Sequence, residues 1–176
     1  MQTEPQTMPD TIALLATLLR RELRLPELPP RVLVYNTNWD IPQTKDLFLV
    51  IGILADDNYG EGQGYSYDPV AQVLVENQIA ARSTTYTVDA FSVTTEARRR
   101  RHEILFALQG DAAQRLSERH SLRIFRPTPF VDLSHLEASR RLNRYQTQFA
   151  VFEGFGQTKP VPILTPPFKP ELLINA

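Results

Sequence analysis

The apolar positions near the N-terminus recur at helical spacing. Leu15, Leu19 and Leu23 follow one another every four residues, which places them on one face of a helix. Asp10 precedes this series as a candidate N-cap, and the proline-rich segment 26–30 ends it, because proline lacks the backbone donor that continues a helix. The pattern predicts a short amphipathic helix that packs on the rest of the domain.

Later segments carry the patterns of β-strands. Residues 47–54 are apolar apart from Gly52, which is typical of a strand covered on both faces. Residues 141–152 alternate between apolar and polar positions, as in a half-buried strand. The buried face predicted for this strand consists of Tyr145, Thr147, Phe149 and Val151. Less regular patterns predict further strands at 32–35, 70–79, 84–93 and 122–125.

Two adjacent segments in the middle of the chain are predicted to be helical. Residues 96–109 carry apolar side chains at helical spacing, with Thr94 or Thr95 as the cap and Gly110 as the stop. Residues 111–120 predict a second, shorter helix. One further helical turn is expected near Ser134, because a glutamate follows it at capping-box spacing, at position 137.

The order of these elements predicts an α+β fold in a single domain over residues 1–155. Strands follow one another, and the helices stand at the start and in the middle instead of alternating with them. We therefore expect a mainly antiparallel or mixed β-sheet with helices packed on one face. Residues 156–176 are rich in proline but also carry Ile163, Leu164 and Phe168, so we expect an extended C-terminal arm that docks on this domain or on a neighbour.

Four consecutive arginines, residues 98–101, open the predicted central helix. Successive helical residues turn by about 100°, so these side chains fan around the helix, and Arg101 falls on the core-facing side. A solvated, partly paired run is the plain interpretation, since a grip on DNA needs clustered charge. Phe106 falls opposite the core face beside Arg99 and His102, which predicts a protein interface formed by these residues and Arg98.

The polar, glycine-rich segment 56–69 is predicted to be an exposed loop. It contains GEGQG at 60–64, but phosphate-binding loops lead directly into a helix, and here a strand-like sequence follows. We therefore predict no phosphate site. Tyr59, Tyr65 and Tyr67 are residues that protein interfaces favour, so a contact with another protein is the functional hypothesis for this segment.

Composition narrows the classes of function further. The 19 basic and 20 acidic residues nearly cancel, so the chain as a whole is not drawn to nucleic acid, and the absence of cysteine excludes disulfides and thiolate chemistry. His102, His120 and His135 lack metal-ligand spacing, and no Gly-x-Ser-x-Gly motif occurs. We predict no catalytic residues, no cofactor and no metal. We also expect no membrane span and no signal peptide.

Taken together, these patterns resemble the tail terminator, or neck terminator, proteins of long-tailed phages. The resemblance spans roughly residues 10–155 and begins with the N-terminal amphipathic helix. Its other parts are DLFLVIGIL at 46–54, RSTTYTVDAFSVTTEARRRRHEILFALQGD at 82–111, and RIFRPTPFVDLSHLEASRRLNRYQTQFAVFEGF at 123–155.

The resemblance implies a structural virion protein, assembled in the host cytoplasm, with an α/β fold. Such proteins form a hexameric ring at the head-proximal end of the tail, stop growth of the tail tube and sheath, and join the tail to the head-side connector or stopper protein. DNA passes through the lumen without specific binding. Three alternatives stay open: another neck or tail-completion component, a nucleic-acid-binding module using 98–101 with Arg119, Arg123 and Arg126, and an enzyme with a site around 56–68.

Overall fold

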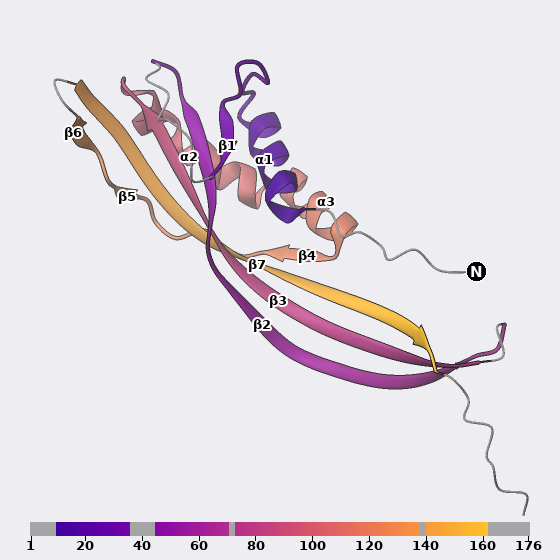
Figure 1. Ribbon diagram of the computed structural model, residues 1–176. Coiled ribbons are helices and arrows are strands. Elements are labelled where there is room, and N and C mark those ends of the chain that lie inside the picture. Colours follow the sequence, from indigo (N-terminus) through magenta and orange to yellow (C-terminus); the bar gives the residue numbers. More distant parts are fainter. Residues whose placement is uncertain (1–9, 36–44, 71–72, 138–139, 162–176) are drawn as a thin grey trace, which may run out of the picture.

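The structure is a computed structural model that describes residues 10–35, 45–70, 73–137 and 140–161 (Figure 1). The helices are α1 (Thr11–Glu22), α2 (Glu96–Gln109) and α3 (Asp111–His120). The strands are β1 (Val32–Val34), β2 (Phe48–Asp68), β3 (Val73–Ser92), β4 (Leu122–Ile124), β5 (Val131–Asp132), β6 (His135–Glu137) and β7 (Arg140–Pro160).

A mixed β-sheet organises the chain, with the strand order β1-β2-β3-β7-β4. The short strand β1 runs parallel to β2, whereas β2, β3, β7 and β4 are antiparallel to their neighbours. The strands β5 and β6 also pair with β7. The three helices lie together on one side of the sheet (Figure 1). The predicted α+β class is therefore confirmed.

The main core lies between these helices and one half of the sheet. Leu15 and Leu19 of α1 and Ile104 of α2 are fully buried there against Val88 and Val151 of the central strands. Burial of a large aliphatic side chain stabilises the fold by about 1.5–3 kcal/mol, so the periodic positions of the helices hold the layers together. The predicted buried face of β7 is confirmed, because all four of its residues are buried.

Residues 47–51 are buried on both faces of the sheet, as expected for this apolar run. One face belongs to the main core. On the opposite face Phe48 and Phe91 stack with their ring centroids 5.0 Å apart, and Val50 and Leu142 join them in a second, smaller cluster. The coverage ends at Gly52, since Ile53 and Leu54 are exposed.

The prediction of a loop at 56–69 is wrong. Strand β2 continues through this segment and pairs with β3 as far as Asp68, which is opposite Val73. The predicted strands 70–79 and 84–93 are accordingly parts of the single strand β3. The polar composition of the segment reflects its exposure to solvent on both faces, and the pairing itself satisfies the backbone groups that make it a strand.

The predicted helical turn after Ser134 is also wrong. Residues His135–Glu137 form strand β6, and β7 supplies the backbone partners of this strand, with His135 opposite Leu142. A capping box stabilises a helix only where three or four further residues continue it. Here residues 135–137 pair with the start of β7, and this pairing keeps them extended.

The long strands extend well past the helices and form a projecting ribbon (Figure 1). We call this ribbon the β arm and define it as residues 56–70, 73–82 and 153–161. Strand β3 lies in its middle, and β2 and β7 are its two edges. Strand β7 ends at Pro160, so residues 156–160 of the predicted C-terminal segment belong to the sheet, whereas Ile163, Leu164 and Phe168 lie outside the described residues.

Candidate interaction surfaces

Helix α2 has the predicted bounds, and hydroxyl groups before it complete its first turn. Thr95 is the N-cap but makes no capping hydrogen bond with its side chain. Instead Ser92 Oγ accepts from the backbone N–H of Ala97 at 3.0 Å, and Thr94 Oγ1 accepts from that of Glu96 at 3.4 Å. These contacts satisfy donors that a helix start leaves open, and they fix the direction in which the arginine run leaves the sheet.

Two of the four arginines are paired within the helix. Arg99 Nη1 lies 3.4 Å from Glu96 Oε1, and Arg100 Nη2 lies 2.7 Å from Glu103 Oε2. Arg100 also donates to the backbone oxygen of Leu23 at 2.8 Å, which ties α2 to the end of α1. The hydrogen bond with Glu103 raises the pKa of Arg100 above its ordinary value. These two side chains therefore act within the fold.

The other two arginines carry no ion pair in the part of the chain that the structure describes. Arg98 is exposed, and Arg101 lies with its guanidinium 4.7 Å from the centre of the Tyr145 ring. The core-facing position predicted for Arg101 thus brings it to an aromatic face, which attracts a cation. Both arginines line a hollow of about 300 Å³ that Phe130 and Asp132 also border.

The outer side of α2 presents the predicted interface residues. Phe106 is 74% exposed, and His102, which is also exposed, meets the edge of the Phe130 ring at 6.1 Å between centroids. Arg98, Arg99, His102 and Phe106 therefore all lie at the surface of one helix. A large aromatic side chain left in solvent is typical of a contact site.

Gly110 separates α2 from α3 as predicted, for a steric reason. It is both the C-cap of α2 and the N-cap of α3. A Cβ atom at this position would lie 2.8 Å from the backbone oxygen of Phe106, closer than van der Waals contact allows. The glycine lets the two helices meet at this junction.

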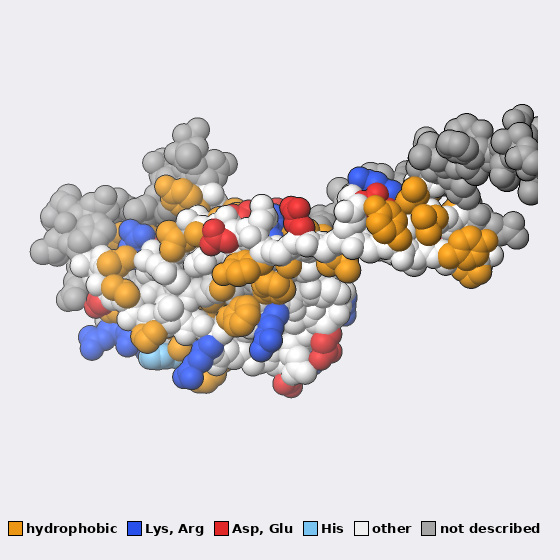
Figure 2. Space-filling model, turned by 90° about the horizontal axis from the view of Figure 1, so that it is seen from below, with side chains coloured by type: hydrophobic (Ala, Val, Ile, Leu, Met, Phe, Trp, Pro, Cys, Tyr) orange, Lys and Arg blue, Asp and Glu red, His pale blue; other side chains and the backbone are white. Residues whose placement is uncertain are grey.

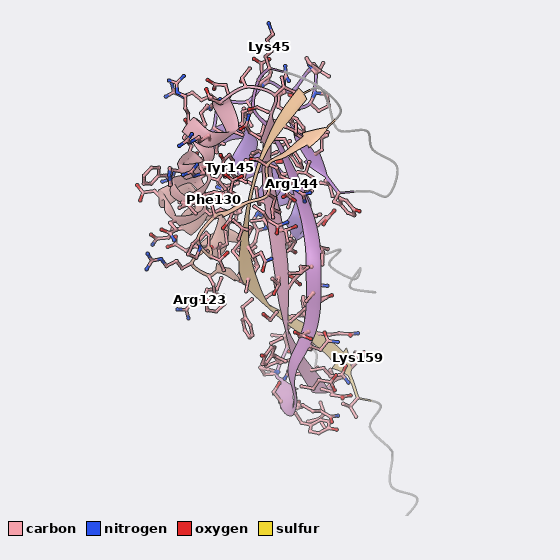
Figure 3. The ribbon with its side chains drawn as sticks, turned by 90° about the vertical axis from the view of Figure 1, so that its left-hand side faces the viewer. Lys45, Arg123, Phe130, Arg144, Tyr145 and Lys159 are labelled. Atoms are coloured by element: carbon pink, nitrogen blue, oxygen red, sulfur yellow. The ribbon has the colours of Figure 1, made fainter. Side chains whose placement is uncertain are left out.

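A groove next to this junction is lined by basic side chains. It holds about 500 Å³, and its walls come from the α2–α3 junction, from α3 and from the chain around β4. We call it the basic groove and define it by Gln109, Gln114, Ser117, Arg123, Ile124 and Arg126. Arg123 also covers the exposed Phe125 ring at 5.1 Å, and Figure 3 shows Arg123 pointing away from the body.

The three predicted contact tyrosines of β2 are all exposed, but they do not share a face. Tyr65 is opposite Glu76, and Tyr67 is opposite Leu74, on the face that continues from the helix-covered side. Simple alternation would add Tyr59 to this face. Gly60, with a φ of 57°, forms a β-bulge that takes up one extra residue and moves Tyr59 to the other face.

An ion-pair cluster that the sequence did not indicate lies at the base of the β arm. Arg82 Nη2 lies 2.7 Å from Glu153 Oε2, and Arg82 Nε lies 3.6 Å from Asp56 Oδ1. Glu153 is only 3% exposed, and its hydrogen bond raises the pKa of Arg82. Burial, helped by the charge of Glu153, raises the pKa of the neighbouring Tyr86 to about 12. The cluster ties all three long strands together.

No protein-family model matches the chain, and no curated protein matches it. Among the described residues, no helix is long and apolar enough to cross a membrane. Within the same residues, no group of three or more histidine, aspartate or glutamate side chains is arranged to hold a metal ion.

Proposed function

We propose that this chain is a structural protein of the phage neck, which forms a ring at the head-proximal end of the tail. In this role it stops growth of the tail tube and sheath and joins the tail to the head-side connector. The observation that carries the proposal is the β arm. A three-stranded ribbon that leaves large apolar side chains in solvent on both faces suits a protein that is completed by its neighbours in an assembly.

Two further observations support the proposal. The fold packs helices on one side of a mixed sheet, and it therefore combines the two kinds of element found in the α/β fold that the resemblance to terminator proteins implies. In addition, large exposed side chains lie on separate parts of the surface, among them Phe106 on α2 and Tyr65 and Tyr67 on the β arm. A ring subunit that also meets a tail tube and a connector needs more than one contact surface.

The direct test is assembly of tails with and without this protein. Host cells that produce the phage with this gene deleted should contain full heads without joined tails, together with tail tubes of irregular length. Supplying the wild-type protein should restore joined virions and a single tail length, both measured by electron microscopy. Normal virions from the deletion strain would contradict the proposal.

The arginine content of the segment that contains α2, α3 and β4, which we call the helical layer, favours one second candidate, a nucleic-acid-binding module. Segment 96–126 carries eight arginines and four acidic residues. Binding through phosphate contacts would weaken steeply with salt, by about 10³–10⁵-fold between 50 and 200 mM when six to ten phosphates are contacted. Fluorescence anisotropy with a labelled DNA duplex measures this. Salt-dependent binding of that size, lost on Arg123→Glu with Arg126→Glu, would favour the second candidate.

A further inference from the structure

The β arm and the helical layer of the same chain carry opposite charge. The β arm has six acidic residues and two basic ones, whereas segment 96–126 has eight arginines and four acidic residues. The chain as a whole has a net charge of only -1. The opposite charges are therefore sorted into two regions. Figure 2 shows basic side chains spread over the body and a group of hydrophobic side chains on the projecting arm.

Ion pairs among the described residues do not neutralise the positive region. Six of its arginines have no carboxylate within ion-pair distance in the described part of the chain: Arg98, Arg101, Arg115, Arg119, Arg123 and Arg126. Two of them, Arg123 and Arg126, border the basic groove, whose other walls are apolar or uncharged. This groove thus offers two cationic side chains beside an apolar floor, which suits aromatic and acidic side chains together.

The negative region presents side chains of that kind on one face of the β arm. Tyr65 and Tyr67 are each 61% exposed there, and the cross-strand register places Glu61 and Glu76 on the same face. The carboxylate of Glu76 accepts a hydrogen bond from the neutral side-chain amide of Gln78 at 2.7 Å. We call Glu61, Tyr65, Tyr67 and Glu76 the tyrosine face.

The arm is a single sheet, so charges on its two faces act together. Side chains on opposite faces lie within about 10 Å of each other, which is comparable with the Debye length at physiological salt. Asp57 and Asp68 on the opposite face therefore add to the negative field of Glu61 and Glu76. Lys159, near the far end of the arm in Figure 3, is the cross-strand partner of Glu76 on the tyrosine face and offsets one of these charges.

We propose that the tyrosine face of one copy docks in the basic groove of a second copy. The arm projects past its own helices, so the two surfaces of one molecule do not meet (Figure 1). A contact between two different surfaces is head-to-tail, and such contacts close into a ring when the rotation between copies allows it. The inference rests on the ring of the proposed function and assigns the contact that builds it. The negative charge of the arm disfavours a nucleic acid, whose phosphates are also negative, as the partner of the tyrosine face.

The proposal is tested by exchanging the charges of the two surfaces. Wild-type protein should form a species larger than the 20.1 kDa monomer in light scattering after size exclusion, and its mass should fall as salt rises. Glu61→Lys with Glu76→Lys should weaken self-association by about tenfold or more, and so should Arg123→Glu with Arg126→Glu. A mixture of these two variants should associate again, because each supplies the charge that the other lacks.

Matched controls keep the outcome decisive. Glu22→Lys with Glu27→Lys makes the same charge change at the end of α1 and should leave the mass unchanged. Tyr65→Ser with Tyr67→Ser removes the apolar part of the contact without changing charge and should also weaken association. Circular dichroism checks that each variant is folded. A monomeric wild type, an equal effect of the control, or failure of the mixture to associate would overturn the proposal.

The same samples separate this inference from the proposed function. Each variant is also added to purified tail tubes, and capping of the tube end is scored by electron microscopy. A wild type that is monomeric in solution but caps tubes would overturn the contact and leave the proposed function in place. A wild type that forms rings through this contact but never binds tubes would contradict the proposed function alone. A large DNA-dependent mass shift would favour the nucleic-acid candidate instead.

Discussion

The body and the β arm are built from the same three strands, yet their side chains lie in opposite environments. In the body, β3 and β7 carry fully buried residues such as Val88 and Val151 under the helices. In the arm, the same strands leave Ile79 61% exposed between two glycines, Gly62 and Gly156. The backbone pairing continues across the boundary, with β2 shifting register against β3 at Leu54 and Gly60, so the hydrogen-bond ladder alone does not create a core. Coverage by helices does.

The helix-covered body provides most of the stability of the fold, and the arm adds little. Three strands without a covered hydrophobic face add little to folding, because the ordering of the backbone opposes the modest gain from exposed pairs. The arm is therefore held by the body through its continuous strands, and the ion pair of Arg82 with Glu153 ties two of these strands together at the base of the arm. Large exposed side chains on such an element are better explained by contacts with other molecules than by folding.

The largest expected effect comes from truncating one large apolar side chain on each side of the boundary. Phe149→Ala in the body should lower the free energy of unfolding by about 3–5 kcal/mol, because it opens a cavity against Tyr86. Ile79→Ala in the arm should change it by less than about 0.5 kcal/mol, since the side chain is exposed. Urea unfolding measures both. Equal losses would remove the distinction between body and arm.

The next effect concerns Tyr86, a buried residue of β3 near the base of the arm. Its pKa is about 12 in the fold against 10.0 ordinarily, so the unfolded chain releases this proton first as pH rises. The stabilisation is complete below pH 10 and is lost towards pH 12, by about 2–3 kcal/mol. Tyr86→Phe should remove this part of the alkaline loss, measured by urea unfolding at pH 9 and pH 11.5. An equal loss of unfolding free energy between these two pH values in the variant and the wild type would contradict the prediction.

A smaller effect is expected at the ion-pair cluster itself. Arg82→Met leaves the carboxylate of Glu153 buried without its cation and should cost about 2 kcal/mol, less than for a fully buried pair because Arg82 is about one-third exposed. Replacing both partners, Arg82→Met with Glu153→Leu, should recover most of the loss. Thermal unfolding of the single and double variants measures this. A double variant as unstable as the single one would show that packing dominates.

The smallest effect is local to the arm. Gly60→Ala places a Cβ at a φ of 57° and should cost about 1–2 kcal/mol there. Faster amide hydrogen exchange in residues 56–68 and 73–82 should report this, with no change in the helices. Gly64→Ala is the matched control, because nothing lies within 4 Å of the added atom and its φ is not in the left-handed region. Faster exchange in both variants would place the effect outside the bulge.

Local patterns in the sequence predicted the helices and the covered part of the sheet. The bounds of α2 follow from an apolar repeat between a threonine pair and Gly110, and the buried face of β7 follows from alternation. Both signals need only neighbours along the chain. The strand at 56–68 was missed because its polar, glycine-rich composition is also that of loops, and only its partner β3 makes it a strand.

The candidate surfaces could be predicted only in part, because only some of their features follow from neighbours along the chain. The exposure of Phe106 follows from the helical wheel, whereas the separation of Tyr59 from Tyr65 depends on a bulge that no periodicity reveals. The pairing of Arg82 with Glu153 joins residues 71 positions apart in the chain. Register between distant strands sets that contact, and a single sequence does not encode register in any local pattern.

The bulge at Gly60 determines which residues of strand β2 lie on each face of the arm. Tyr59 is opposite Ala81 and Glu61 is opposite Ala80, so the residue between them has no cross-strand partner of its own. Deleting Gly60 would leave each remaining pair in place and would simply straighten the strand. Deleting Gly64 would instead shift one side of the ladder by a residue and exchange the two faces there. The arm should thus tolerate deletion of Gly60, whereas deletion of Gly64 should exchange the two faces of the strand there.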